Sequence, residues 1–189
     1  MAWDTERTKQ LLLDAATVEF SARGLAGARV DRIAAQAGVN KERIYSYFGG
    51  KEELFGAVLQ RELALAMETF AIAGTGPEAV AAYAGRMFDY QGEHPHLARL
   101  TFWEGLELAE PVALELRRAG VDAKVAGVRA AMPELSEAEA RELLLTILTL
   151  CDGYHVLRNI EVINHGAAAA SPARRADRRA AIVAAVLAA

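Results

Sequence analysis

The chain has little cysteine: Cys151 is the single thiol among 189 residues. One thiol cannot form an intramolecular disulfide, so a disulfide-stapled fold is excluded and the cytoplasm is the expected compartment. Long apolar runs are also missing. The most apolar stretch, residues 143–151, is far shorter than the roughly 20 residues that cross a bilayer, and the amino-terminal residues are charged. We therefore expect neither a membrane span nor a signal peptide.

Prolines number only five, and no stretch shows the sustained alternation of β-branched and polar residues that a half-buried strand requires. Alanine and leucine dominate, and the hydrophobic fraction of 53% suffices for a buried core. We predict an all-α protein of about nine helices. A three-helix domain at residues 1–50 should precede a larger helical domain, the body, at residues 51–189.

Helix boundaries are predicted from glycine, proline and capping residues. Gly24 should end the first helix, and Ser136 with Glu139 forms a capping box. The predicted ranges are about 4–24, 30–37, 41–47, 51–70, 77–91, 95–108, 111–132 and 136–164, with a last helix opened by Ser171 and Pro172.

Residues 33–51 have the spacing of a helix-turn-helix. Ala34 is small where two helices would cross, and Gly38 tolerates the positive φ of a tight turn. The predicted inward stripe consists of Ile33, Ala37, Val39, Ile44 and Tyr47, which leaves Lys41, Glu42, Arg43 and Ser46 facing outward. Asn40 is a suitable N-cap for the second helix, whose first turn would read base edges.

The net charge of −4 is unevenly distributed along the chain. Residues 1–55 contain eight Lys and Arg and eight Asp and Glu, so the entire excess of negative charge lies in the remainder. An acidic body behind a less acidic reading end suits a protein that contacts DNA with one end only.

Flanking residues extend this pattern: Phe20 and Gly24 precede the unit, and Tyr45, Phe48 and Lys51-Glu52 close it. Over about residues 5–60 the chain resembles the DNA-binding domain of the TetR family of transcriptional regulators. The resemblance implies a homodimer that binds an inverted-repeat operator in double-stranded DNA, and a body that takes a small-molecule effector. Many members carry Ser or Thr where this chain has Ala28, Arg29 and Val30, so we expect the Arg29 guanidinium to hold the phosphate instead.

Candidate DNA contacts lie on the outward face of this unit and at its edges. They are Arg29, Asn40, Lys41, Glu42, Arg43, Tyr45, Tyr47 and Lys51. Arg43 should read a base, in a bidentate contact to guanine, and Lys51 should hold a phosphate. Glu42 is expected to select rather than add affinity, and one of the two tyrosines should contact DNA. The alternative for each is a solvated helix face or core packing.

Candidate effector contacts are apolar and aromatic residues of the body with a few polar groups. They are Tyr83, Met87, Phe88, Phe102, Trp103, Glu104, Tyr154 and His155. The Trp103–Glu104 pair could receive a cationic or hydroxylated aromatic compound. Plain core packing is the alternative for each of these residues.

The apolar faces of the last two predicted helices indicate a dimer interface, with Leu148, Cys151, Ile182, Val183 and Val186 as candidates. Cys151 has apolar neighbours and is expected to be a buried structural thiol rather than a redox sensor. The basic cluster of Arg174, Arg175, Arg178 and Arg179 should pair with acidic residues of the body or of a partner subunit.

We interpret the chain as a repressor released from its operator by a small apolar or aromatic ligand. The alternative is a ligand-independent regulator whose body only dimerises or contacts a protein partner. No nucleophile constellation, Glu-x-x-His pair or glycine-rich phosphate loop is present, so neither an enzyme nor a cofactor is expected. His94 and His96 lack further ligands at suitable spacing, and no metal site is predicted.

Overall fold

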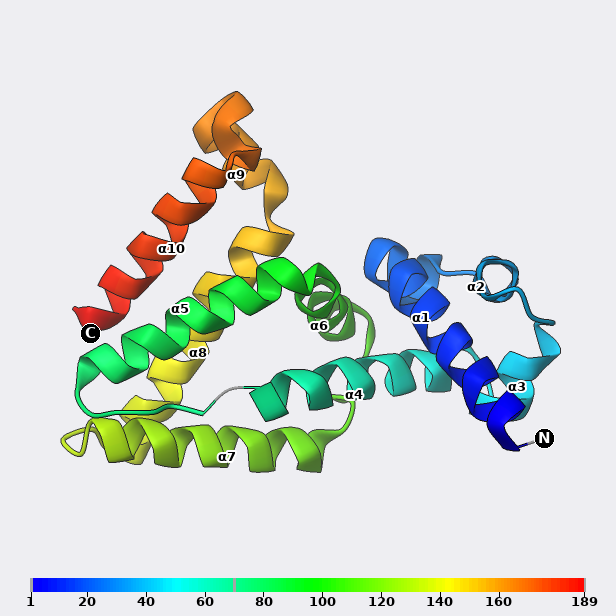
Figure 1. Ribbon diagram of the computed structural model, residues 1–189, viewed down its shortest axis with the longest axis horizontal. Helices are drawn as coiled ribbons and strands as arrows, with labels where there is room; N and C mark the ends of the chain where they lie inside the picture. The colour runs from blue at the N-terminus through cyan, green and yellow to red at the C-terminus, as the bar shows by residue number, and fades with distance from the viewer. Residues whose placement is uncertain (1, 70, 189) are drawn as a thin grey trace. The chain divides into compact units, whose positions relative to one another are not determined.

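A computed structural model describes residues 2–69 and 71–188, and within these ranges it contains ten α-helices, one 3-10 turn and no strand. This confirms the predicted all-α class (Figure 1). The elements are α1 (Ala2–Gly27), α2 (Val30–Ala37), α3 (Glu42–Phe48), α4 (Lys51–Thr69), α5 (Pro77–Glu93), α6 (Pro95–Glu107), α7 (Leu114–Ala131), α8 (Glu137–Val156), α9 (Arg158–His165), η1 (Gly166–Ala170) and α10 (Pro172–Leu187).

The chain divides into two compact units that are not continuous in sequence. The first unit runs up to Ala66 and resumes at His96–Leu114, so it holds α1 to α3, most of α4 and nearly all of α6. The second unit comprises Met67–Pro95 and the residues from Glu115 onward. This division differs from the predicted boundary after residue 50, because α4 and α6 pack on the helices of the first unit.

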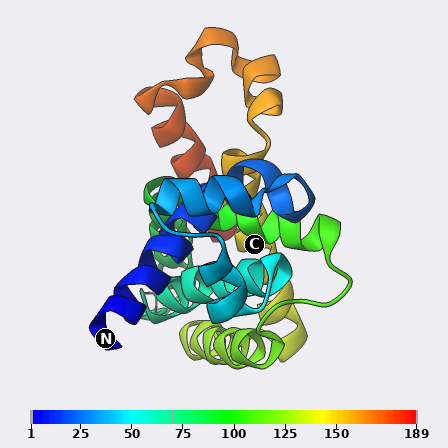
Figure 2. The ribbon, with the colours of Figure 1, turned by 90° about the vertical axis from the view of Figure 1, so that its right-hand side faces the viewer.

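The core of the first unit forms around α1. Phe20 of α1 meets Phe55 of α4 edge to face, with ring centroids 5.2 Å apart. Leu12, Ile33 and Ile44 from α1, α2 and α3 are fully buried beside them. Figure 2 looks onto α1, α2 and α3, drawn from blue to cyan. Of the predicted inward residues, Ile33 and Ile44 therefore lie in this core, whereas Ala37, Val39 and Tyr47 are only half-buried.

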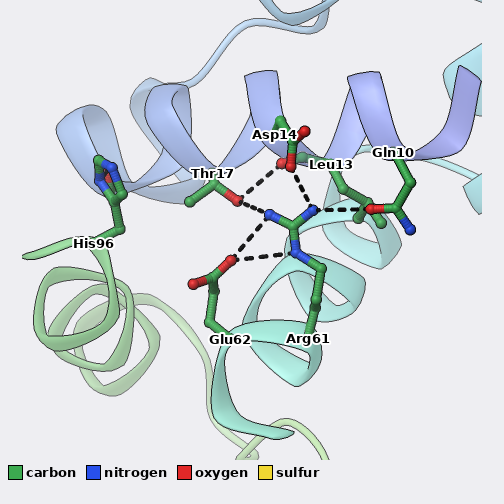
Figure 3. A network of polar contacts seen from close by, with 8 residues as sticks. Gln10, Leu13, Asp14, Thr17, Arg61, Glu62 and His96 are labelled. Atoms are coloured by element: carbon green, nitrogen blue, oxygen red, sulfur yellow. Dashed lines mark hydrogen bonds and ion pairs between the residues drawn. The ribbon is translucent and has the colours of Figure 1, made fainter. Parts of the chain in front are cut away.

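A polar network fixes α4 against α1 (Figure 3). The Arg61 guanidinium of α4 donates to Asp14 Oδ1 at 2.7 Å and to Thr17 Oγ1 at 2.9 Å, both on α1. Its Nε and Nη2 also donate to Glu62 Oε1. One planar guanidinium thus sets the register between the two helices.

The first helix breaks at Gly24, as predicted. Gly24 has φ 70°, and a Cβ there would lie 2.8 Å from the Trp103 ring of α6 and 2.6 Å from Glu107 Oε1. Beyond the break, Glu107 Oε2 accepts hydrogen bonds from the backbone N–H groups of Leu25 and Ala26 at 2.5 and 3.1 Å. A carboxylate of α6 therefore satisfies backbone donors that the interrupted helix leaves unpaired.

Pro111 does not open α7, which begins at Leu114 instead. The intervening backbone turns through Ala113 at φ 53°, and Glu104 Oε1 accepts from the Val112 N–H at 2.6 Å. This side-chain hydrogen bond holds the connection in a non-helical turn, which the proline signal alone could not indicate.

In the second unit, α5 packs between α8 and α10, and α10 lies along α5 (Figure 1). The fully buried members of this core include Val80, Tyr83, Phe88, Val128 and Ile147. The capping box at the start of α8 is confirmed, since Ser136 Oγ accepts from the Glu139 N–H at 3.2 Å and Glu139 Oε2 accepts from the Ser136 N–H at 2.8 Å. Ile147 and Cys151 of α8 share this core with α5, whereas Leu145 and Leu148 of α8 are exposed.

The predicted helix over 136–164 is two helices. Leu157, at φ −86° and ψ 48°, interrupts it, so α9 is separate from α8 and η1 leads back into α10. Ser171 caps α10 as expected, because its Oγ accepts from the Arg174 N–H at 3.1 Å. These breaks raise the number of α-helices from the expected nine to ten.

Candidate nucleic-acid interface

The turn between α2 and α3 is held by Gly38. This residue has φ 69° and ψ 30°, and its N–H points back to the carbonyls of Ala34 and Ala35. The Val39 N–H also donates to Ala34 O at 3.0 Å. Together these bonds terminate α2 in a left-handed cap, which a side chain at position 38 would strain. The buried Ile33 and Ile44 then fix how α3 crosses α2.

Asn40 starts α3. Its Oδ1 accepts a hydrogen bond from the Glu42 backbone N–H at 3.0 Å, which satisfies one of the free donors of the first turn. Lys41, Glu42, Arg43 and Tyr45 are exposed, and Tyr45 retains 52% of its surface. The first turn of α3 therefore presents hydrogen-bonding side chains to solvent, which is the arrangement of a helix that enters the major groove.

Arg43 is held against Tyr47, its neighbour one turn later. The guanidinium Nη1 donates to Tyr47 Oη at 3.1 Å, and its carbon lies 5.7 Å from the centre of the ring. Lys9 of α1 also approaches this ring, at 6.0 Å. Tyr47 is half-buried rather than part of the core, so its ring supports two cations at the surface.

Lys41 forms an ion pair across the turn with Asp31 of α2, at 3.0 Å. The hydrogen bond to Asp31, together with its charge, raises the pKa of Lys41. Both side chains are exposed, so the pair competes with any phosphate that approaches Lys41.

Arg29 precedes α2 and makes no side-chain cap, as the absence of Ser or Thr at this point predicts. Glu19 of α1 compensates from another helix. Its Oε1 accepts from the Arg29 N–H at 3.0 Å and from Arg32 Nε at 2.7 Å, and the residue is only 7% exposed. Partial burial opposes ionisation of this carboxyl, but its bonds to Arg32 and Arg29 outweigh that effect and lower its pKa.

Glu19 was not among the predicted functional residues. A signal was available in the sequence, because Glu19 falls within the inward stripe of α1, one turn after Ala15 and Ala16. An acidic residue in such a stripe requires a partner, and Arg32 supplies it.

Lys51 lies at the start of α4, and its ammonium donates to Ala28 O at 3.3 Å and Ala26 O at 3.5 Å. The side chain therefore crosses to the connection between α1 and α2. The predicted phosphate contact at Lys51 would have to form in addition to these bonds or in place of them.

The predicted effector contacts are divided between the two units. Phe102, Trp103 and Glu104 belong to the first unit, while Tyr83, Met87, Phe88, Tyr154 and His155 belong to the second. Trp103 Nε1 donates to Ser21 O at 3.3 Å and Glu104 accepts from Val112, so the polar groups of this pair serve the packing of α6.

Three of the five predicted dimer contacts lie inside the protomer. Cys151, Ile182 and Val186 are 0%, 1% and 3% exposed, because they pack into the core that α5, α8 and α10 share. Val183 is half-buried, and Leu148 is exposed, as is Leu145 one turn earlier. The apolar surface that α8 leaves for a partner is therefore the Leu145–Leu148 face. Cys151 is a buried structural thiol as predicted, and burial raises its pKa to about 12.

Two of the four arginines of α10 pair with acidic residues as expected, whereas Arg175 and Arg178 donate to backbone carbonyls. Arg179 binds the Asp89 carboxylate of α5 at 2.8 Å, and Arg174 binds Glu161 of α9 at 3.0 Å. α5 and α10 also border a groove of about 360 Å³ whose walls include Ala81, Ala82, Val183 and Leu187.

In the described parts of the chain, His, Cys, Asp and Glu form no group of three that could hold a metal ion. His94 stacks on Tyr90, and His96 Nδ1 lies 2.9 Å from Ser21 Oγ. None of the helices in these ranges combines the length and apolar character of a membrane span.

Both parts of the chain match known family models. Residues 12–58 match the model for bacterial regulatory proteins of the tetR family, and residues 79–187 match the tetracyclin repressor-like C-terminal domain. The transcriptional repressor SCO4008 of Streptomyces coelicolor is 43% identical over 106 residues, 56% of this chain and 54% of the relative. The repressor NicS of Pseudomonas putida is 33% identical over 109 residues, 56% of this chain and 51% of the relative. The chain thus spans about half the length of these curated relatives.

Solved structures agree over the whole chain. The putative transcriptional regulator SCO4942 of Streptomyces coelicolor is 34% identical with a TM-score of 0.70, covering 95% of this chain and 96% of that one. A TetR-like regulator of Rhodococcus sp. RHA1 is 20% identical with a TM-score of 0.65, covering 96% of each chain, and shares the fold.

Proposed function

Because this chain belongs to the TetR family of DNA-binding transcriptional regulators, we propose that it is a homodimeric repressor that leaves an inverted-repeat operator when a small molecule binds its second unit. The family consists of regulators rather than enzymes. The observation that carries the proposal is the exposed first turn of α3, which Asn40 caps and the buried Ile33 and Ile44 orient.

In this proposal α3 enters the major groove and Arg43 reads a guanine. Tyr47 holds the Arg43 guanidinium extended before DNA arrives, which lowers the entropy lost on binding. Lys41, Tyr45, Lys51 and Arg29 contact phosphates, which position the helix without reading sequence. Glu42 disfavours bases that present an acceptor to it.

The names of the relatives support repression, since SCO4008 and NicS are both called repressors. An activator is the second candidate for the sign of regulation. FasR of Mycolicibacterium smegmatis, called a transcriptional activator, is 48% identical over 58 residues, 31% of this chain and 26% of that relative. This similarity covers only the DNA-binding part, so it does not distinguish an activator from a repressor.

The chain connects the units in a way that suits ligand control. α4 continues from the first unit into the second, and α6 of the first unit follows α5 of the second. A ligand that favours one conformation of the second unit would change the spacing of the two α3 helices in a dimer. Its effect cannot exceed its differential affinity for the two states, typically about 1–3 kcal/mol.

Operator selection from random duplexes, followed by anisotropy titration, tests the proposal. The selected sites should be inverted repeats whose half-sites lie roughly 34–36 Å apart or a multiple of that distance. Failure to enrich any duplex at low ionic strength would contradict DNA binding. Enrichment of single, unrepeated half-sites would contradict the dimer.

A ligand-independent regulator, whose second unit only dimerises or binds a protein, is the alternative. The open groove between α5 and α10 is the observation that favours it, since its apolar residues are flanked by the charged Glu78, Arg86 and Arg179, a mixture that suits a protein partner. Operator affinity that no small molecule changes, combined with capture of a defined partner by α10, would support this alternative.

A further inference from the structure

A buried polar pair links α5 and α8 in the second unit. Gln91 Nε2 of α5 donates a hydrogen bond to Asp152 Oδ1 of α8. Gln91 is 3% exposed and Asp152 is 7% exposed. The pair lies in a bundle whose other buried members are mostly apolar, so its polar groups require partners from within the protein or from a ligand.

Two acceptor atoms beside this pair have no hydrogen-bond partner among the described residues. One is Gln91 Oε1. The other is His155 Nε2, because the imidazole uses its other nitrogen to bond the backbone of Phe88. Gln91 follows Phe88 by one turn of α5, and His155 follows Asp152 by one turn of α8. The His155 ring lies 5.3 Å from that of Phe88, so α5 and α8 approach each other here as they do at Gln91 and Asp152.

We name Gln91, Asp152 and His155 the acceptor cluster. Within the described residues Asp152 has no ion-pair partner, although four arginines of α10 lie in the same unit. Those arginines bond other groups, although the Nε of Arg178 is buried without a hydrogen-bond partner among the described residues. Arg179 and Arg174 hold Asp89 and Glu161, Arg178 donates to Leu150 O at 3.0 Å, and Arg175 donates to Asp89 O at 3.2 Å.

We propose that the acceptor cluster binds the cationic, N–H-bearing end of a small molecule, an ammonium or amidinium group, with Asp152 as its counterion. All three members present acceptors, so the complementary group is one that carries several donors. A positive charge on that group also compensates the buried carboxylate, which a hydroxyl or an amide would leave unpaired. A carboxylate ligand would be repelled.

The surroundings suit a ligand with an aromatic or apolar remainder. Phe88 and Tyr154 lie with ring centroids 5.2 Å apart and offer apolar surface, and the Arg175 guanidinium already lies 6.0 Å from the centre of the Phe88 ring. His155 is half-buried as a residue, whereas its Nε2 atom is buried. These residues were among the predicted effector contacts, whereas Gln91 and Asp152 were not.

The protonation state of Asp152 should change when a cationic ligand binds the acceptor cluster. Burial raises the pKa of Asp152 to about 7, and the hydrogen bond from Gln91 only partly opposes that rise. The other titratable or charged groups on the packed elements are Asp89 on α5, Cys151 and His155 on α8, and Arg175, Arg178 and Arg179 on α10. Burial lowers the pKa of His155, so this imidazole remains a neutral acceptor at neutral pH. A cation that binds the ionised carboxylate should release a proton from Asp152.

The test uses three isosteric probes on the full chain without DNA: benzamidine, which is cationic, benzamide, which is neutral, and benzoate, which is anionic. Calorimetry should show benzamidine binding at least about tenfold tighter than benzamide and no binding of benzoate, in line with the large effect of an unpaired buried polar group. Benzamidine affinity should rise as pH increases through about 7, with proton release visible in buffers of different ionisation enthalpy. Equal binding of benzamidine and benzamide, or no binding of either, would overturn the proposal.

Two variants locate the site. Asp152→Asn keeps the shape and removes the charge, so it should abolish the preference for benzamidine and its proton release. Glu142→Gln removes an exposed carboxylate from the same helix and should change neither. A preference for benzamidine that survives in Asp152→Asn would place the site elsewhere and overturn the proposal.

The regulatory meaning of this site rests on the proposed function, and operator release is therefore measured separately on the selected duplex. Release by benzamidine that Asp152→Asn abolishes would assign the cluster to the effector. Binding without release would leave the site in place and remove it from operator control. Failure to bind any duplex would contradict the proposed function while leaving the calorimetric result unaffected.

Discussion

The two units treat buried charge in opposite ways. In the first unit, Glu19 accepts a backbone N–H and two arginine side chains, and Arg61 reaches three oxygen acceptors at or below 2.9 Å. In the second unit, Asp152 is bonded to a single amide, and two nearby acceptors have no partner among the described residues. Glu19 and Arg61 therefore have several oppositely charged or hydrogen-bonding partners each, whereas Asp152 has one neutral partner.

The functions that we propose for the two units would account for this difference. A reading helix must keep one geometry, and matched buried charges penalise every other geometry. A ligand site instead gains affinity from groups that the free protein leaves unsatisfied, each costing about 1–3 kcal/mol until a ligand pairs with it. The contrast can be tested by removing charge from each unit in turn.

The largest effect is expected from Glu19→Ala. The substitution leaves the Arg29 N–H without its acceptor and Arg32 without its partner, which should lower the free energy of unfolding by about 3 kcal/mol. Urea denaturation measures the loss. Glu6→Ala removes an exposed carboxylate of the same helix and should cost less than about 1 kcal/mol. An equal loss of unfolding free energy in both variants would contradict the claim that the partners of Glu19 stabilise the first unit.

The opposite sign is expected for Asp152→Asn at pH 8. The folded protein holds this proton up to about pH 7, whereas the unfolded chain releases it near 3.8. The free energy of unfolding therefore falls as pH rises from about 4 to about 7.

That decline corresponds to about 4 kcal/mol for three pKa units, and the unmatched donors of the new amide should offset about half of it. Asp152→Asn should thus gain about 2 kcal/mol at pH 8 and lose about 2 kcal/mol at pH 4, where the wild-type carboxyl is still protonated in the folded protein, as measured by urea denaturation at both values. Destabilisation at pH 8 would show that Asp152 is matched after all.

Arg43→Ala should weaken operator binding about tenfold, or about 1.4 kcal/mol, and leave random duplexes unaffected. Lys51→Ala should weaken both kinds of duplex alike and reduce the salt slope by about one. Anisotropy titrations over a range of salt concentrations separate the two. Identical profiles for both variants would contradict the division between base reading and phosphate contact.

The smallest effect is expected from Asp31→Asn. It releases Lys41 from its ion pair, so the affinity for any duplex should rise by about threefold and the salt slope should steepen. The matched control is Asp4→Asn, which removes an exposed carboxylate of α1 and leaves Lys41 paired. A rise that is confined to the selected operator would assign Lys41 to base reading.

Elements with local signals could be predicted from the sequence. Gly24, Gly38, the Ser136 capping box and Ser171 with Pro172 all act within one turn of their own helix, and each boundary appears in the structure. The α8 break at Leu157 and the late start of α7 could not be predicted, because neither depends on a residue with a distinctive backbone preference.

Contacts between helices were harder to predict from the sequence. The outward residues of α3 follow from periodicity, and their exposure agrees with it. The burial of Ile182 and Val186 under α5 depends on which of two apolar faces meets the core, and periodicity alone cannot decide that. Glu19 and Asp152 were missed for a related reason, since an acidic residue in an apolar stripe gains meaning only when its partner is known.

The first unit is built from two separate segments of the chain, and this has a consequence for biosynthesis. Because His96–Leu114 completes this unit, its packing cannot finish until well over half of the chain has been translated and has left the ribosome. A gene fragment ending at residue 50 or 66 would encode the reading helix without the Trp103 and Glu107 side chains that pack against the broken end of α1. Grafting this specificity onto another regulator therefore requires transplanting two separate stretches of coding sequence rather than one.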